Sequence, residues 1–463
     1  MSNPFYIESL QELKERAGPN AALHAALPLL EQHPHSIQLI NFVGAMYFEK
    51  RAYDTCLPFY QLAAKIDPEN AEIQNTLGVV YRRNSEVRKA LGCYEKALKL
   101  KPDYAEAHNN LAVALKDAGL PENALRHLHY AIKLSPNYSH AHNNLGLVYR
   151  DLSRFNDAIE SFEKALIFSP EYKPAVANLM ETLRLTHEPK KSNNPIISVH
   201  ASLIELSKVF FEDDTWSESK IVRFLTQCFA VAEAEAVDLR TRQSQIFNQT
   251  GRNLNCSRHK AIFNQYNIIA KHCFGCFKVQ VDFHSLLDLL RLTFASYTLV
   301  LPGNPIRKSM IEMREGVGGT YKAILFCSEL EQAEQSATEL TRLTEACSHD
   351  AKISIKRGCS EFAASFPLYK EVSEDKSGSF PYPQQWEKIE SEFDKANPNI
   401  LRRVNPSMPH VALHDLCIVR KWIDYAKGLG DASVPKFSAL ETRYPHVEQE
   451  GRARRAKQLL VRS

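Results

Sequence analysis

Apolar positions in the first part of the chain recur every 34 residues. Within each unit they lie three and four residues apart, which is the spacing of one face of a helix. A proline closes each unit and would end a helix there. The pattern therefore predicts a stack of antiparallel helix pairs, one pair per unit. The closing residues are Pro34, Pro68, Pro102, Pro136 and Pro170.

Each unit also places a small residue in its first helix and a large residue in its second, which lets the two helices nest closely. The small positions are Gly44, Gly78, Ala112 and Gly146, and the large ones are Tyr60, Tyr94, Leu128 and Phe162. This pattern resembles the tetratricopeptide repeat over about residues 3–186, with four full repeats at 37–170 and irregular end units. The resemblance implies an α-solenoid of helix pairs whose concave wall holds a peptide or a partner helix.

Asparagines recur at the positions that the resemblance places in this concave groove. Amides donate and accept hydrogen bonds, so a ladder of them could hold an extended peptide backbone. Arginines one turn further along would favour an acidic ligand, although Asp117 and Asp151 counteract this. The alternative is that these side chains form an ordinary solvated face. The predicted groove residues are Asn75, Asn109, Asn110, Asn143, Asn144, Asn178, Arg82 and Arg150.

The chain beyond the repeats changes in pattern and resembles no family that we can name. Residues 187–198 are polar and proline-containing and indicate a linker, and residues 199–250 show helical periodicity. Residues 251–372 form a cysteine-rich α+β region. Residues 373–463 predict a helical extension whose last thirteen residues, an end expected to be frayed, carry five positive charges and no acid.

Alternation of apolar residues predicts four strands in the α+β region. They are "FKVQVDF", "RKSMIEMR", "TYKAILFC" and "AKISIKRGC", with a helix after the first and after the third. The order strand, helix, strand, strand, helix, strand is that of a ferredoxin-like βαββαβ core with flanking helices. In that topology the first strand lies between the third and the fourth.

Cysteines gather near the predicted first strand. Cys256 and His259, followed by Cys273 and Cys276, offer two close pairs of ligands, which is how proteins commonly deliver four ligands to Zn²⁺. Cys327 and Cys359 are alternative ligands, because the topology brings the ends of the third and fourth strands to the same edge. An iron–sulfur cluster, a redox-active C-x2-C pair and unligated cysteines in a turn are the other interpretations.

Composition narrows the class of function. The chain has 463 residues, 44% of them hydrophobic, and a net charge of +3, so charge alone does not indicate a protein that coats nucleic acid. We expect no secretory signal and no membrane span, and therefore a cytoplasmic protein with reduced cysteines. Arg307, Lys308, Lys356 and Arg357 could form a basic patch on the sheet or a solvated face.

These features favour a cytoplasmic interaction scaffold with a zinc-stabilised C-terminal module. The first alternative is an enzyme whose repeats recruit a protein substrate to a metal- or thiol-dependent catalytic domain. No nucleophile, base and orienting group occur together, so no reaction is assigned. The second alternative is an RNA-associated protein, although the first and third strands lack the pairs of aromatic residues that stack bases.

Overall fold

The computed structural model forms two compact units, unit 1 (Met1–Leu179) and unit 2 (Met180–Ser463). The structure describes residues 5–462 except 187, 188, 190, 214, 239, 242, 249–255, 315–318, 348–350, 360, 361, 363, 371–380, 397–408 and 438–444.

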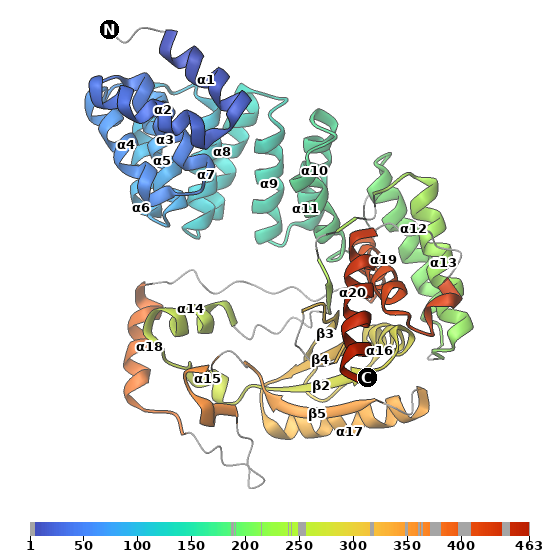
Figure 1. Ribbon diagram of the computed structural model, residues 1–463. Helices are drawn as coiled ribbons and strands as arrows, with labels where there is room; N and C mark the ends of the chain where they lie inside the picture. Colours follow the sequence, from blue (N-terminus) through green and yellow to red (C-terminus); the bar gives the residue numbers. More distant parts are fainter. Residues whose placement is uncertain are drawn as a thin grey trace. The chain divides into compact units, whose positions relative to one another are not determined.

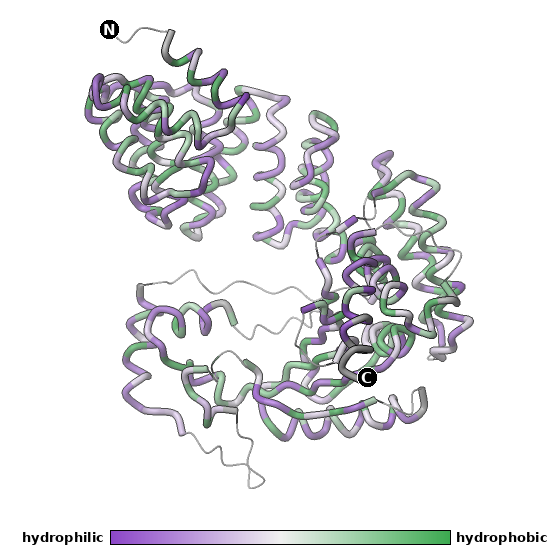
Figure 2. Tube along the Cα trace, in the orientation of Figure 1, coloured by the Kyte–Doolittle hydropathy of each residue, from purple (hydrophilic) through white to green (hydrophobic). Residues whose placement is uncertain are grey.

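Unit 1 is a helical solenoid (Figure 1). Four predicted helix pairs, α3 to α10, occupy residues 37–168 and confirm the 34-residue period. Figure 2 shows hydrophobic and hydrophilic residues alternating along these helices, as expected for helices with one buried face. The helices are α1 (Phe5–Ala17), α2 (Pro19–Gln32), α3 (Ile37–Glu49), α4 (Tyr53–Ile66), α5 (Ala71–Arg83), α6 (Val87–Leu100), α7 (Ala105–Asp117), α8 (Pro121–Leu134), α9 (Ser139–Asp151), α10 (Phe155–Phe168) and α11 (Lys173–Leu183), which continues into unit 2.

The helices of each pair are in close contact at the predicted small and large positions. A Cβ atom added at Gly78 would lie 2.6 Å from the ring of Tyr94, and one at Gly146 would lie 2.5 Å from the ring of Phe162. The third pair has Ala112 where the others have glycine, and its large position holds the smaller Leu128. Both are fully buried. The extra methyl group in the first helix therefore accompanies a smaller side chain in the second.

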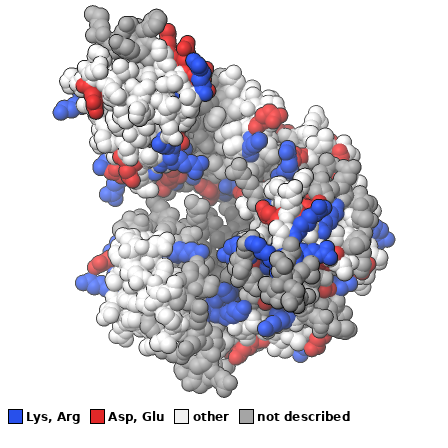
Figure 3. Space-filling view, viewed as in Figure 1, with Lys and Arg blue, Asp and Glu red and all other residues white. Residues whose placement is uncertain are grey.

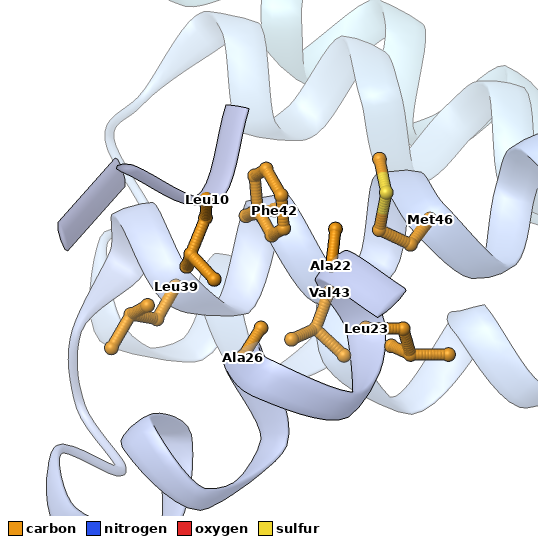
Figure 4. Packing of buried hydrophobic residues seen from close by; sticks show 8 residues of the cluster. All are labelled: Leu10, Ala22, Leu23, Ala26, Leu39, Phe42, Val43 and Met46. Carbon is orange, nitrogen blue, oxygen red and sulfur yellow. The ribbon is translucent and has the colours of Figure 1, made fainter. Parts of the chain in front are cut away.

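The irregular first unit completes the core at the N-terminal end (Figure 4). Leu10 of α1 and Ala22 and Ala26 of α2 pack against residues of α3. The sticks in Figure 4 show Leu10, Ala22, Leu23, Ala26, Leu39, Phe42, Val43 and Met46. This contact shields the apolar face of the first full repeat, which a terminal repeat would otherwise expose to water.

Unit 2 contains a five-stranded antiparallel sheet with the order β1-β3-β4-β2-β5. β2 therefore lies between β4 and β5. The strands are β1 (Gln245–Asn248), β2 (Phe277–Phe283), β3 (Ile306–Ile311), β4 (Tyr321–Cys327) and β5 (Lys352–Arg357). The prediction of helices alone at 199–250 was wrong at β1, which is too short for periodicity to reveal and is fixed by pairing with the edge of β3.

Two helices pack against most of the sheet. Contacts place α16 against β2, β3 and β4, and α17 against β2, β4 and β5. The helices are α12 (Pro195–Phe210), α13 (Glu218–Ala234), α14 (Cys256–Tyr266), α15 (Lys271–Phe274), α16 (Leu286–Thr298), α17 (Leu330–Cys347), α18 (Gln385–Ala396), α19 (Leu413–Leu429) and α20 (Pro445–Arg462). Short 3-10 helices are η2 (Pro367–Lys370) and η3 (Val434–Phe437). No helix in the described residues has the length and apolar composition needed to cross a membrane.

The basic C-terminal segment is helical, which corrects the expectation of a frayed tail. It forms α20, which packs against α19. A Cβ atom at Gly428 would meet the backbone of Glu448, and one at Gly451 would meet the backbone of Tyr425. The backbones of α19 and α20 can approach this closely because each helix has a glycine where the two cross.

Candidate functional sites

Three hydrogen bonds join the asparagines of successive repeats. Asn110 Nδ2 donates to Asn75 Oδ1 at 3.0 Å, and Asn144 Nδ2 donates to Asn109 Oδ1 at 2.8 Å. Asn178 Nδ2 donates to Asn143 Oδ1 at 2.9 Å. The predicted asparagine ladder thus links α5, α7, α9 and α11.

The two asparagines of each pair differ in burial. Asn75, Asn109 and Asn143 are buried, whereas Asn110, Asn144 and Asn178 are half-buried. An amide nitrogen carries two hydrogens, and the donor of each pair uses one of them to bond the preceding repeat. The ladder therefore has a structural role in joining successive repeats.

The basic residues next to the ladder pair largely with aspartates of the next repeat. Arg82 Nη1 lies 3.2 Å from Asp117 Oδ2. Lys116 Nζ lies 3.1 Å from Asp117 Oδ1 and 4.0 Å from Asp151 Oδ2. The position one repeat beyond, 35 residues after Arg150, holds Leu185 instead of an acid. These pairs offset the positive charge of Arg82 and Lys116 and weaken the predicted preference for an acidic ligand.

An apolar stripe runs beside the asparagine ladder and was missed from the sequence. Val79, Val113 and Leu147 are half-buried and stand three residues after Thr76, Asn110 and Asn144. Residues three apart lie on the same side of a helix. We call the surface formed by these six residues and Asn178 the ladder face. The sequence does contain a signal for this stripe. An apolar residue recurs there every 34 residues, and it is not one of the small and large positions at which the two helices of a repeat pack together.

Thiols meet near the start of β2. Cys256 begins α14, Cys273 lies in α15 and Cys276 precedes β2, while Cys327 ends β4 and Cys359 follows β5. The pKa of the Cys273 thiol is raised, first by a hydrogen bond with Cys359 and then by burial. Burial, together with the neighbouring Cys359, Cys256 and Cys327, raises the pKa of Cys276 to about 12. Neither is an activated thiolate at neutral pH, which disfavours a reactive thiol or a redox-active pair.

His259 is buried, with its ring 5.4 Å from that of His272. Burial lowers its pKa to about 4, and His272 and Arg258 contribute to that shift. Arg258 pairs with Glu390 at 3.0 Å and Asp394 at 2.6 Å on α18. Cys359, Cys276 and Cys256 all act on the pKa of the Cys273 thiol, which indicates that these four cysteines lie near one another.

The thiol group has a close-packed glycine beside it. A Cβ atom at Gly358 would overlap Cys276 Sγ, and the Gly358 amide donates to the Cys276 carbonyl at 2.9 Å. Within the described residues, no three or more His, Cys, Asp or Glu side chains are arranged to hold a metal ion. The structure therefore brings the thiols to one edge without forming a complete metal geometry.

The predicted basic patch on the sheet divides between its two faces. Arg307 is buried and donates to the carbonyl oxygens of Ser296 and Leu299 at the end of α16. Arg357 donates to the carbonyl of Phe274. Lys308 and Lys356, one residue away from each arginine, point to the opposite face because side chains alternate along a strand.

Comparison with known proteins supports the repeats. A profile described as TPR repeat matches residues 80–119, and one described as Tetratricopeptide repeat matches residues 140–172. No curated protein matches.

Solved structures that resemble the chain each cover between 35% and 39% of it. MamA is 20% identical over 35% of this chain and 96% of its own, with a TM-score of 0.32. YrrB, described as a TPR protein with an unusual peptide-binding site, is 22% identical over 38% of this chain and 91% of its own, with a TM-score of 0.32. A thermophilic TPR protein of Thermus thermophilus, TTC0263, is 17% identical over 39% of this chain and 97% of its own, with a TM-score of 0.35.

Proposed function

Because the chain contains tetratricopeptide repeats, we propose that it is an interaction scaffold whose ladder face binds an extended segment of a partner protein. The observation that carries the proposal is the half-buried row of Asn110, Asn144 and Asn178, one amide per repeat. Its spacing repeats with the fold, so a ligand backbone that runs along the row meets an equivalent donor in each repeat.

The apolar stripe complements the amides. Backbone hydrogen bonds contribute about 0.5 to 1.5 kcal/mol net each, so three of them alone give weak binding. Val79, Val113 and Leu147 add apolar area on the same face. The partner segment that fits is therefore extended, with apolar side chains facing the stripe. Because Arg82 and Lys116 are ion-paired, the partner segment need not be acidic.

The test uses peptides selected for binding to the full chain from a library of random displayed sequences. Val113→Glu together with Leu147→Glu should weaken binding of the selected peptides by at least about tenfold, because it charges the stripe at half-exposed positions. Ile167→Glu is the matched control, since Ile167 is 67% exposed on the second helix of its pair. Equal affinity of the double variant and the control for the same peptide would remove the ladder face as the binding site.

We also propose that unit 2 is stabilised by Zn²⁺ held by cysteine thiolates. The convergence of Cys256, Cys273, Cys276 and Cys359 supports it, because four sulfur ligands are typical of structural zinc. The raised pKa values of Cys273 and Cys276 mean that metal binding would release protons from these thiols. The sequence-based set with His259 in place of Cys359 is the alternative, and a closed set of four would leave no position for a catalytic water.

Elemental analysis of the purified chain distinguishes the two ligand sets. We expect one zinc per chain that is lost in Cys359→Ser and kept in His259→Gln. Cys93→Ser in unit 1 is the control for loss of a cysteine as such. Iron in place of zinc would favour a cluster, and absence of any metal would leave the thiols as packed side chains.

We infer further that the sheet of unit 2 is the core of a ferredoxin-like fold in a cytoplasmic protein. Support for the fold comes from the order β2, α16, β3, β4, α17, β5 and from the strand order β3-β4-β2-β5. An architecture of this kind names no function.

A further inference from the structure

The sheet of unit 2 has one face covered by helices and one face rich in lysine. Arg307 contacts the end of α16, so its side of β3 is the covered side. The pairing register of the strands, together with the alternation of side chains along each strand, then assigns the other side chains to one face or the other. We call the opposite face the lysine face. It carries Gln245 and Phe247 on β1, Ile306, Lys308 and Met310 on β3, Lys322, Ile324 and Phe326 on β4, Lys278, Gln280 and Asp282 on β2, and Lys352, Ser354 and Lys356 on β5. Of these, Met310, Lys322 and Ile324 are buried.

Charges are balanced at one end of the lysine face. Asp282 stands opposite Lys322 on one side and Lys352 on the other. Nearby, Glu312 Oε2 lies 2.7 Å from Arg314 and 3.9 Å from Lys322. Each acid at this end therefore has basic neighbours and each base has an acid.

The other end is basic. Lys278 and Lys356 are directly opposite each other on β2 and β5. Like charges in that position are destabilising. Burial lowers the pKa of Lys308, and the nearby positive charges of Arg314, Lys278 and Lys260 lower it as well. The negative charge of Glu312 acts on the pKa in the opposite direction. Glu312 is the acid already held by Arg314 and Lys322.

Aromatic rings lie among these lysines. Phe326 is half-buried and pairs with Lys278 across the strands. Lys308 Nζ lies 5.3 Å from the centre of the half-buried Phe247 ring. Figure 3 shows several Lys and Arg side chains on the visible face of unit 2. The fold thus keeps positive charge and flat apolar surface together at one end of the sheet.

We propose that the basic end of the lysine face binds single-stranded nucleic acid. Phosphates would offset the repulsion among Lys278, Lys308 and Lys356, and bases would stack on Phe326 and Phe247. A combination of lysines with aromatic rings fits a nucleic-acid strand better than an acidic peptide, because every nucleotide carries a flat base beside its phosphate. Sequence inspection missed the rings because they lie on β1, which was not predicted, and on β4 beside apolar neighbours.

The test measures binding of a fluorescently labelled RNA strand of about 20 nucleotides to the full chain by anisotropy at several salt concentrations. Lys308→Gln with Lys356→Gln removes two phosphate partners. The slope of log Kd against log salt should therefore fall by about 1.4, since each phosphate contact on a single strand contributes about 0.7. Phe326→Leu should weaken binding by about tenfold through loss of stacking.

Arg342→Gln is the matched control. Arg342 is exposed on α17, which covers the opposite face, and pairs with Glu339 at 2.8 Å. It should leave both affinity and slope unchanged. The proposal fails if the wild-type chain does not bind the strand, or if the double variant binds with the same affinity and slope. It also fails if a polyglutamate peptide of equal charge competes as well as unlabelled RNA.

Discussion

At the closest approach of two helices in a repeat, one methyl group decides whether they fit. Gly146→Ala would place a Cβ atom 2.5 Å from Phe162, so the ring or a helix must move. Overpacking of this kind costs about 1 to 3 kcal/mol, which outweighs the gain of about 0.5 to 1 kcal/mol from replacing a helical glycine. Chemical denaturation should show a lower free energy of unfolding for unit 1.

Gly92→Ala provides the matched control, because an added Cβ atom meets nothing within 4 Å at that helical position. It should be neutral or stabilising by up to about 1 kcal/mol. Adding Phe162→Leu to Gly146→Ala recreates the alanine and leucine of the third repeat and should recover part of the loss. A destabilisation of Gly92→Ala as large as that of Gly146→Ala would show that close packing is not the cause.

A second residue-scale prediction concerns His200, which is fully buried. Burial and the neighbouring His410 lower its pKa to about 3. The unfolded chain therefore binds a proton at higher pH than the folded one, and stability falls as pH drops from about 6.5 toward 3. Between about pH 7 and pH 5 we expect a loss of up to about 2 kcal/mol for this group.

His200→Phe removes the titrating ring while keeping a large side chain. Its melting temperature should depend less on pH over that interval than that of the wild type. His24→Gln, at an exposed position in unit 1, should keep the wild-type dependence. An unchanged pH profile in His200→Phe would rule out this histidine as the source.

At the scale of elements, the asparagine ladder is part of what fixes one repeat to the next. Asn144→Ala should lower the free energy of unfolding by about 1 to 3 kcal/mol, because it leaves the buried Asn109 Oδ1 without its donor. Thr76→Ala is the comparison at the position that interrupts the ladder, since the Thr76 hydroxyl donates to the carbonyl of Glu72 in its own helix at 2.9 Å. If both variants lose the same stability, the inter-repeat bond contributes nothing specific.

Helices whose apolar residues recur at a regular spacing could be predicted from the sequence. Strands that depend on pairing with another strand could not. The positions of Gly78 and Tyr94 repeat every 34 residues, so the helix pairs followed directly. β1 is four residues long and depends on the edge of β3. The proximity of Cys359 to Cys273 required the strand order, which sequence spacing alone left open. His259 fitted a ligand spacing, yet its surroundings on α14 and α18 are set by tertiary contacts.

At the scale of the whole molecule, unit 1 and unit 2 have separate hydrophobic cores, so we expect them to respond separately to denaturing conditions. Unit 1 is a solenoid in which each repeat packs on its neighbours, so its stability is a sum of local terms. Unit 2 has a sheet core with strands brought together over long sequence separations, and such cores tend to unfold as a single cooperative unit. A chain with two units of such different construction need not follow a single two-state transition.

We therefore predict two transitions in the unfolding of the full chain, each assigned by variants of one unit. Gly146→Ala should shift the transition reported by loss of helical circular dichroism in unit 1. Acidification to about pH 5, and a chelator if zinc is present, should shift the transition of unit 2, because His200 and the thiols lie there. One transition that moves with every one of these changes would mean that the units unfold together.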